Sequence, residues 1–183
     1  MSQIGHNGGP SVQPGVAWRA HCWRAARARL LPTLPIEVVR LRVKRARDLG
    51  LDYRTYASVR AATGHDLIAF LFSSNALRLT RGQTVLPQDR IEKLDAMNCT
   101  RIALAVAPLS PQAIIVNPQI DAAHPAPFAL AKFAEARAVI RVALGKVPGD
   151  RVLLVGDMAL ERDWCAAGRL AGYLPAERFF PNP

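Results

Sequence analysis

The chain has 183 residues, half of them hydrophobic, which is enough to bury one core domain with an appendage. Its longest apolar runs span about six residues, whereas a transmembrane helix needs about 20, so we expect no membrane partner. The first ten residues lack the apolar stretch of a secretory signal, which favours a cytoplasmic location. Three widely separated cysteines fit neither a disulfide framework nor a CxxC motif, so we expect reduced, buried thiols: Cys22, Cys99 and Cys165.

The positive charge is concentrated in the first third of the chain. Residues 1–64 hold 11 Lys and Arg against 3 Asp and Glu, a net +8, and residues 65–183 hold 13 against 11, a net +2. Core packing does not account for such a local excess, which is typical of a surface that meets phosphates or an acidic protein. The leading prediction is therefore non-catalytic binding of nucleic acid, DNA or RNA, in a regulatory role. A scaffold for an acidic protein partner is one alternative.

Four segments are predicted: a flexible tail at 1–17, a basic helical extension at 18–64, an α/β core domain at 65–172 and a C-terminal tail at 173–183. Alanines and arginines between Trp18 and Leu31 favour a helix. Arginines and tryptophans there are suited to pairing with phosphates and stacking on bases. The candidate nucleic-acid contacts in this helix are Arg19, Arg24 and Arg27.

A second helix is predicted after Pro35, with an apolar face made of Ile36, Val39, Val43 and Ala46. Beside that face, Arg40, Lys44 and Arg47 recur at spacings of four and three, which aligns them on one side of the helix. We call these three residues the basic ridge. It is the strongest candidate for phosphate contacts.

A third, short helix is predicted between Asp52, which is placed to cap it, and Gly64, which ends it. It contributes Arg54 to the basic surface. The two short helices have the arrangement of a helix-turn-helix, but the apolar run that follows them suits a buried strand better than a third helix.

Four apolar runs predict an α/β fold with a small mixed sheet of about four strands: residues 67–72, 102–106, 113–116 and 152–155. The gap between the second and third runs is too short for a crossover helix, so these two strands would pair antiparallel if they are adjacent. Three helices are expected to flank the sheet. One opens at Pro87, one runs from Phe128 to Leu144, and one follows Asp157 as its cap. In the second of these, the expected inner face is Ala129, Phe133, Ala136, Ile140 and Leu144.

Polar residues follow the first and last predicted strands and form a candidate ligand pocket: Ser73, Ser74, Asn75 and Asp157. Ligands of open α/β sheets gather at the carboxyl ends of strands, so this pocket requires the two strands to be neighbours. An enzyme acting on a small molecule or phosphate ligand is the second alternative. Glycine-rich phosphate loops and a GxSxG elbow are absent and the acids are scattered, so no catalytic residue, metal or cofactor is predicted.

Residues 151–172 read RVLLVGD followed by Asp163, Ala166, Gly168 and Gly172. This segment of 22 residues resembles the last motif of the haloacid dehalogenase-like phosphohydrolases. The resemblance implies acids after a strand that help to bind magnesium, together with a nucleophilic aspartate at the end of the first strand. Here the first strand ends in Ser73-Ser74-Asn75 without a carboxylate. The resemblance therefore implies an inactive, phosphohydrolase-like protein.

Overall fold

The computed structural model describes residues 34–181, and the chain divides into two units, residues 1–39 and 40–183. Every described strand belongs to the second unit. The predictions for residues 1–31, including the arginines at 19, 24 and 27, fall outside the described residues. Within residues 34–181 no helix combines the length and the apolar character that crossing a membrane requires.

Two helices precede the sheet, α2 (Ile36–Asp48) and α3 (Tyr53–Thr63). The backbone N–H of Thr55 donates to the Asp52 carboxylate at 2.9 Å, which confirms the predicted cap of α3. Gly64 ends α3 with a left-handed φ of 75°, as the sequence predicts.

The predicted apolar face of α2 is buried at only one of its four positions. Ala46 is buried, but Val43 is 36% exposed and Ile36 is 58% exposed. In the C-terminal half of α2, Arg45 also faces the core. Its guanidinium donates to the Asp66 carboxylate at 3.0 Å and to the Leu67 carbonyl at 2.7 Å.

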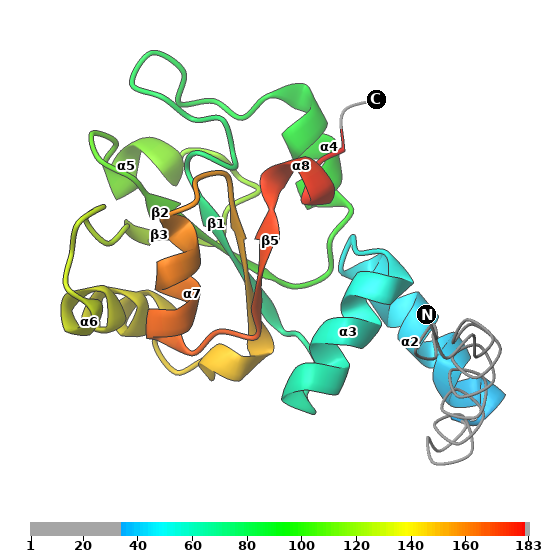
Figure 1. Ribbon diagram of the computed structural model, residues 1–183. Helices are drawn as coiled ribbons and strands as arrows, with labels where there is room; N and C mark the ends of the chain where they lie inside the picture. Colours follow the sequence, from blue (N-terminus) through cyan, green and yellow to red (C-terminus); the bar gives the residue numbers. More distant parts are fainter. Residues whose placement is uncertain (1–33, 182–183) are drawn as a thin grey trace, which may run out of the picture. The chain divides into compact units, whose positions relative to one another are not determined.

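Five parallel strands form the sheet: β1 (Ala69–Ser73), β2 (Thr100–Ala105), β3 (Ala122–Pro125), β4 (Val152–Gly156) and β5 (Gly172–Pro175). Their order is β3-β2-β1-β4-β5 (Figure 1). The α/β class is confirmed, whereas the prediction of four strands in a mixed sheet is wrong. All four strand pairs are parallel because a helix-containing crossover joins each strand to the next.

The predicted strand at residues 113–116 is wrong. This segment contains α5 (Pro111–Ile114), whose first turn is capped by Ser110, since the Ser110 hydroxyl accepts from the N–H of Ala113 at 3.3 Å. The edge strand is instead β3, inside the region predicted to be a loop. Its register pairs Ala123 with Ala103 of β2.

The remaining helices are α4 (Gln88–Asp95), α6 (Phe133–Leu144), α7 (Glu161–Gly168) and α8 (Ala176–Phe179), with a 3-10 turn η1 (Gly149–Arg151). Helix α6 begins five residues later than predicted, at Phe133, and ends at Gly145 as predicted. Phe133 is 58% exposed, so its predicted place on the inner face is wrong. It occupies the first turn of α6, whereas the buried positions begin at Ala136.

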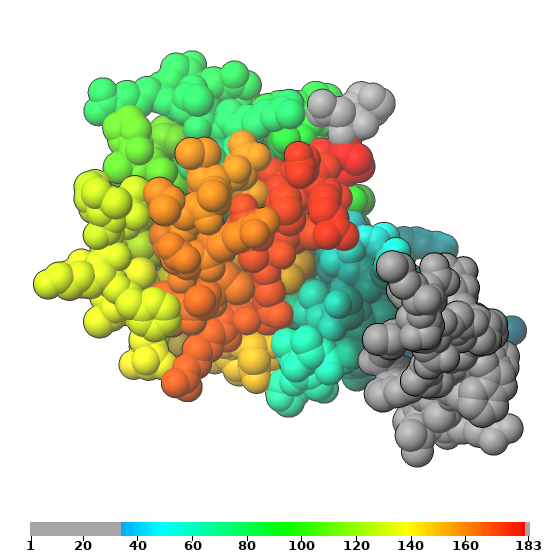
Figure 2. All heavy atoms as spheres, in the orientation of Figure 1, coloured from blue at the N-terminus to red at the C-terminus, as the bar shows by residue number. Residues whose placement is uncertain are grey.

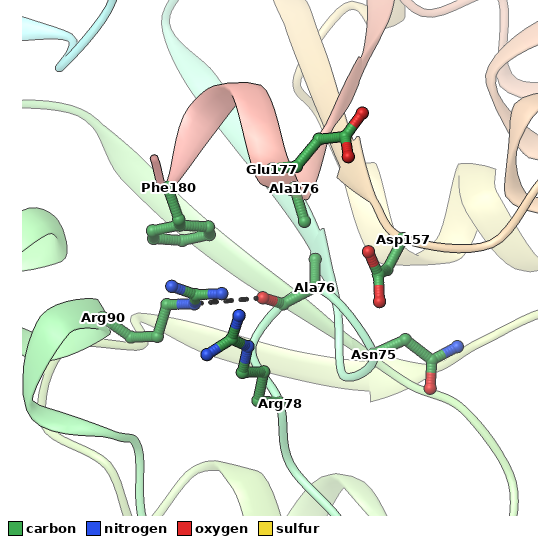
Figure 3. A pocket seen from close by; sticks show the side chains of 8 residues that line it. All are labelled: Asn75, Ala76, Arg78, Arg90, Asp157, Ala176, Glu177 and Phe180. Atoms are coloured by element: carbon green, nitrogen blue, oxygen red, sulfur yellow. Dashed lines mark hydrogen bonds between the residues drawn. The ribbon is translucent and has the colours of Figure 1, made fainter. Parts of the chain in front are cut away.

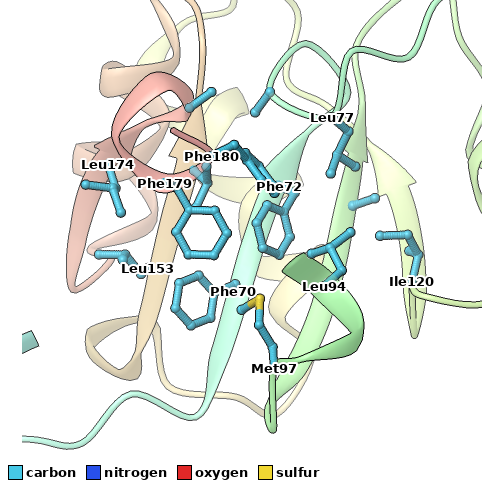
Figure 4. Packing of buried hydrophobic residues seen from close by; sticks show 14 of the residues in the cluster. Phe70, Phe72, Leu77, Leu94, Met97, Ile120, Leu153, Leu174, Phe179 and Phe180 are labelled. Atoms are coloured by element: carbon cyan, nitrogen blue, oxygen red, sulfur yellow. The ribbon is translucent and has the colours of Figure 1, made fainter. Parts of the chain in front are cut away.

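Both faces of the sheet are covered by helices. On β1, Phe70 and Phe72 belong to one apolar cluster and Leu71 to the other, as alternation along a strand requires. The Phe cluster takes in residues of α3, α4 and α8, and Figure 4 shows its aromatic rings gathered over β1. The opposite cluster includes Ile140 of α6 and Trp164 of α7.

Residues 173–181, which the sequence set apart as a tail, complete the sheet with β5 and add α8. Phe179 and Phe180 are 2% and 4% exposed and lie in the Phe cluster. Figure 2 shows β5 and α8 (red) beside α7 (orange) on one face of the second unit. This C-terminal segment is therefore part of the core.

The two described cysteines, Cys99 and Cys165, are partly buried free thiols. Burial raises the pKa of each thiol to about 11, so about one thiol in a thousand is ionised at pH 8. We expect iodoacetamide to alkylate both residues about 100-fold more slowly in the native protein than in urea, as followed by peptide mass spectrometry. Equal rates in the two conditions would show that the thiols are not protected by the fold.

Candidate functional site

The carboxyl ends of β1 and β4 form the topological switch point of the sheet. The strands pair in parallel with Phe72 opposite Val155. From β1 the chain moves outward to β2 and β3, then returns to β4 on the other side of β1 and continues to β5. The connections leave these neighbouring strand ends in opposite directions, which opens a crevice where ligands of such sheets bind. The structure therefore meets the neighbour condition of the predicted ligand pocket.

Glu161 lies beneath this crevice and ties the two strand ends together. Glu161 is 1% exposed. Its carboxylate accepts hydrogen bonds from both strand ends. The four donors are the Ser73 hydroxyl (3.0 Å), the Asn75 amide (2.9 Å) and the backbone N–H groups of Asp157 (2.7 Å) and Met158 (3.2 Å). Among residues 34–181, Glu161 forms no salt bridge, so these four donors are the polar partners of its carboxylate.

The two serines predicted for the pocket have a structural role. Ser73 and Ser74 are both buried, at 0% and 1% exposure. The Ser73 hydroxyl also accepts from the N–H of Ala76 at 3.1 Å, and the Ser74 hydroxyl accepts from the N–H of Val106 at 3.1 Å. They shape the turn after β1 and fasten it to β2, and neither lines the pocket.

Asn75 and Asp157, the other two predicted residues, do line one cavity of about 210 Å³ (Figure 3). Asp157 does not cap α7 as predicted. That helix begins at Glu161, whose side chain accepts from the N–H of Asp157 instead. The Asp157 carboxylate is thus left at the pocket. We call this cavity the carboxyl-edge pocket, and it is lined by Asn75, Ala76, Arg78, Arg90, Asp157, Ala176, Glu177 and Phe180.

Arg90 of α4 is the most deeply buried cation of the described chain, at 2% exposure. Its guanidinium carbon lies 4.2 Å from the centre of the Phe180 ring, and its Nε donates to the Ala76 carbonyl at 3.3 Å. A second donor reaches the adjacent Asp89 carboxylate. Burial lowers the pKa of Arg90, and the nearby charge of Asp89 opposes that shift.

The sequence did not single out Arg78, Arg90, Glu161, Glu177 or Phe180 for this site. Arg78, Arg90 and Glu177 belong to no recognisable motif, and the sequence pattern places Phe180 in the predicted C-terminal tail. For Glu161 a signal existed, because a carboxylate four residues after Gly156-Asp157 can reach back to a strand end. Its side chain crowds Gly156, where a Cβ would collide with Glu161 Oε2.

The basic ridge is a second candidate site. Arg40, Lys44 and Arg47 are all exposed on α2. None of the three has a carboxylate within 4.0 Å in the part of the chain that the structure describes. Arg54 is exposed on α3 and lines an open groove of about 360 Å³ together with Arg178.

Other arginines of the basic N-terminal region are used structurally. Arg45 and Arg60 lie 3.0 and 3.7 Å from the Asp66 carboxylate. The Tyr56 hydroxyl donates to that carboxylate at 2.8 Å. Arg45 and Arg60 therefore use their charge to hold α2 and α3 to the segment that leads into β1.

The resemblance to phosphohydrolases is limited to residues 151–172. Ser73 stands at the end of β1, where the resemblance would require an aspartate, and it is committed to Glu161. Within residues 34–181 no three His, Cys, Asp or Glu side chains gather as metal ligands would. No protein-family model, curated protein or solved structure gave a significant match to this chain.

Proposed function

We propose that the protein binds nucleic acid without catalysis, through the basic ridge of α2. The observation that carries this proposal is that Arg40, Lys44 and Arg47 are exposed together and lack a carboxylate partner within residues 34–181. Unpaired cations on one side of a helix attract phosphates and release the counterions that surround a nucleic acid. Arg45, one residue after Lys44, shows the contrast, because it is turned inward to Asp66.

The spacing of the ridge supports contact with a phosphate backbone rather than with base edges. Residues four and three apart place their side chains one above another along a helix, about one turn between neighbours. Guanidinium and ammonium groups with this spacing can contact successive phosphates, and such contacts orient a protein on a duplex without reading its base sequence. Arg54 on α3 extends the same basic character. The predicted contribution of the arginines at 19, 24 and 27 stays a prediction.

The triple substitution Arg40→Ala, Lys44→Ala and Arg47→Ala should lower affinity for duplex DNA about 10- to 100-fold at low salt. Each phosphate contact contributes about 0.9 to the slope of log affinity against log salt, so the slope should flatten by about 2 to 3. The loss should be similar for all sequences. Fluorescence anisotropy against duplex DNA, single-stranded DNA and RNA, over a salt series, measures both quantities.

The matched control removes three cations elsewhere, by Arg137→Ala, Arg141→Ala and Arg169→Ala. These arginines surround a separate pocket of about 200 Å³, and none has an ion pair within residues 34–181. Equal slopes for the two triple variants would show that net charge, and not the ridge, drives binding. Absence of binding by the parent protein to all three nucleic acids at low salt would rule out the function and leave an acidic protein as the partner of the ridge.

A further inference from the structure

Arg90 offers hydrogen-bond donors that the fold does not use. A guanidinium has five N–H donors, and Arg90 commits one to Ala76 and one to Asp89, which leaves three without a protein partner among the described residues. Figure 3 shows the group reaching into the carboxyl-edge pocket beneath Phe180. No nitrogen of Arg90 is both buried and unpartnered among the described residues, so these free donors reach solvent at the pocket, where an anion would accept from them.

A second guanidinium lies beside it. Arg78 lines the same pocket, and its charge is close enough to lower the pKa of Arg90 further. The backbone of Arg78 has a left-handed φ of 56°, which is unfavourable for a residue other than glycine or asparagine. Its N–H donates to the Asn75 carbonyl at 2.9 Å, so the tight turn after β1 fixes the backbone of Arg78, and its exposed side chain lines the pocket. Two guanidiniums on one wall form a fork-like receptor for a carboxylate or phosphate.

Carboxylates occupy the opposite wall. Figure 3 shows Asp157 and Glu177 on one side of the pocket and the two guanidiniums on the other. Within the described residues, neither carboxylate forms a salt bridge with Arg78 or Arg90. The four charged side chains that line the pocket sum to zero, with the two signs on opposite walls, and Asp89 adds a carboxylate behind Arg90. The acidic wall repels a polyanion, and the basic wall repels a simple cation.

We propose that the carboxyl-edge pocket binds a small zwitterion, with its oxyanion group on Arg78 and Arg90 and its ammonium group on Asp157 and Glu177. The cavity volume of about 210 Å³ is below the roughly 300–1,000 Å³ of pockets for drug-sized ligands, which limits the ligand to a few heavy atoms. The oxyanion belongs to a carboxylate, as in a small amino acid, or to a phosphate, as in a phosphoamine. This site is independent of the basic ridge.

The test is isothermal titration calorimetry of the full chain with four compounds. Two are zwitterions, 4-aminobutyrate and phosphoethanolamine, and two carry one kind of charge, inorganic phosphate and ethylamine. We expect saturable binding of at least one zwitterion, at least tenfold tighter than phosphate or ethylamine, and the better of the two identifies the oxyanion. The proposal is overturned if neither zwitterion saturates the protein at concentrations on the order of tens of millimolar. It is also overturned if phosphate binds the parent protein as tightly as either zwitterion.

Two variants locate the binding. Arg78→Asn removes one guanidinium and introduces asparagine, which tolerates the left-handed backbone at this position. This variant should bind the zwitterion about tenfold more weakly. The double variant Asp157→Asn, Glu177→Gln alters two exposed side chains. It should weaken zwitterion binding and strengthen phosphate binding by about tenfold each, because the repulsion of anions is removed. Unchanged affinities in both variants would place the ligand elsewhere and refute the assignment.

Discussion

Replacing Glu161 by glutamine should lower the free energy of unfolding by about 2 to 4 kcal/mol. Glutamine keeps the volume of glutamate but replaces one acceptor oxygen by an NH2 group, which itself donates. The Asn75 amide reaches Oε1 and the other three donors reach Oε2, so the new NH2 group either forces the Asn75 amide to turn or faces two backbone N–H groups. Urea denaturation followed by circular dichroism, with linear extrapolation, measures the loss.

Asp163→Asn is the matched control, because Asp163 lies on the same helix but is exposed. Its side chain forms no hydrogen bond among the residues that the structure describes, so its amide should change stability by less than about 1 kcal/mol. If Glu161→Gln were as mild as the control, the carboxylate would not tie β1 to β4. The turn that holds Asn75 and Arg78 at the pocket would then need another explanation.

The strands at the centre of the sheet could be predicted because their burial is complete. The residues of β1 and β4 are buried on both faces, so the sequence shows uninterrupted apolar runs there. The ends of α3 could be predicted because Asp52 and Gly64 act locally, through a side-chain cap and a left-handed backbone. Local chemistry and full burial both leave a direct trace in the sequence.

The edge of the sheet could not be predicted, because pairing rather than composition decides it. Strand β3 has the sequence AAHP, without β-branched or aromatic residues, and exists through its register with β2. The run Ala113-Ile114-Ile115-Val116 has strand propensity, but Ser110 and Pro111 start a helical turn before it. Only its Ile114 is buried, which is what one turn of helix can place inside.

Only part of the candidate ligand pocket could be predicted from the sequence, because some of its residues follow buried strands and others are brought there by tertiary packing. Asn75 and Asp157 follow buried strands, so a parallel order with those strands adjacent brings them together. Arg90 was expected only as part of a helix opened by Pro87. Its role depends on Phe180, which the sequence places 90 residues later between prolines, where no local pattern indicates burial.

Replacing Phe179 by alanine should lower the free energy of unfolding by about 3 to 5 kcal/mol. Phe179 is 2% exposed, and its ring centroid lies 4.7 Å from that of Phe180 and 5.5 Å from that of Phe70 (Figure 4). Truncation would leave a cavity between α8 and β1 and remove the ring on which the Lys93 ammonium rests at 5.1 Å.

Phe133→Ala provides the matched comparison, since it removes the same atoms from a residue that is 58% exposed. That variant should stay within about 0.5 kcal/mol of the parent protein, because surface substitutions away from buried contacts have small effects. Urea titrations of both variants, with the slope of each transition recorded, separate lost packing from a change in the denatured state. Equal stability of the two variants would mean that α8 does not pack on the sheet in solution. In that case Phe180 would not hold Arg90 in place, and the carboxyl-edge pocket would lose its buried wall.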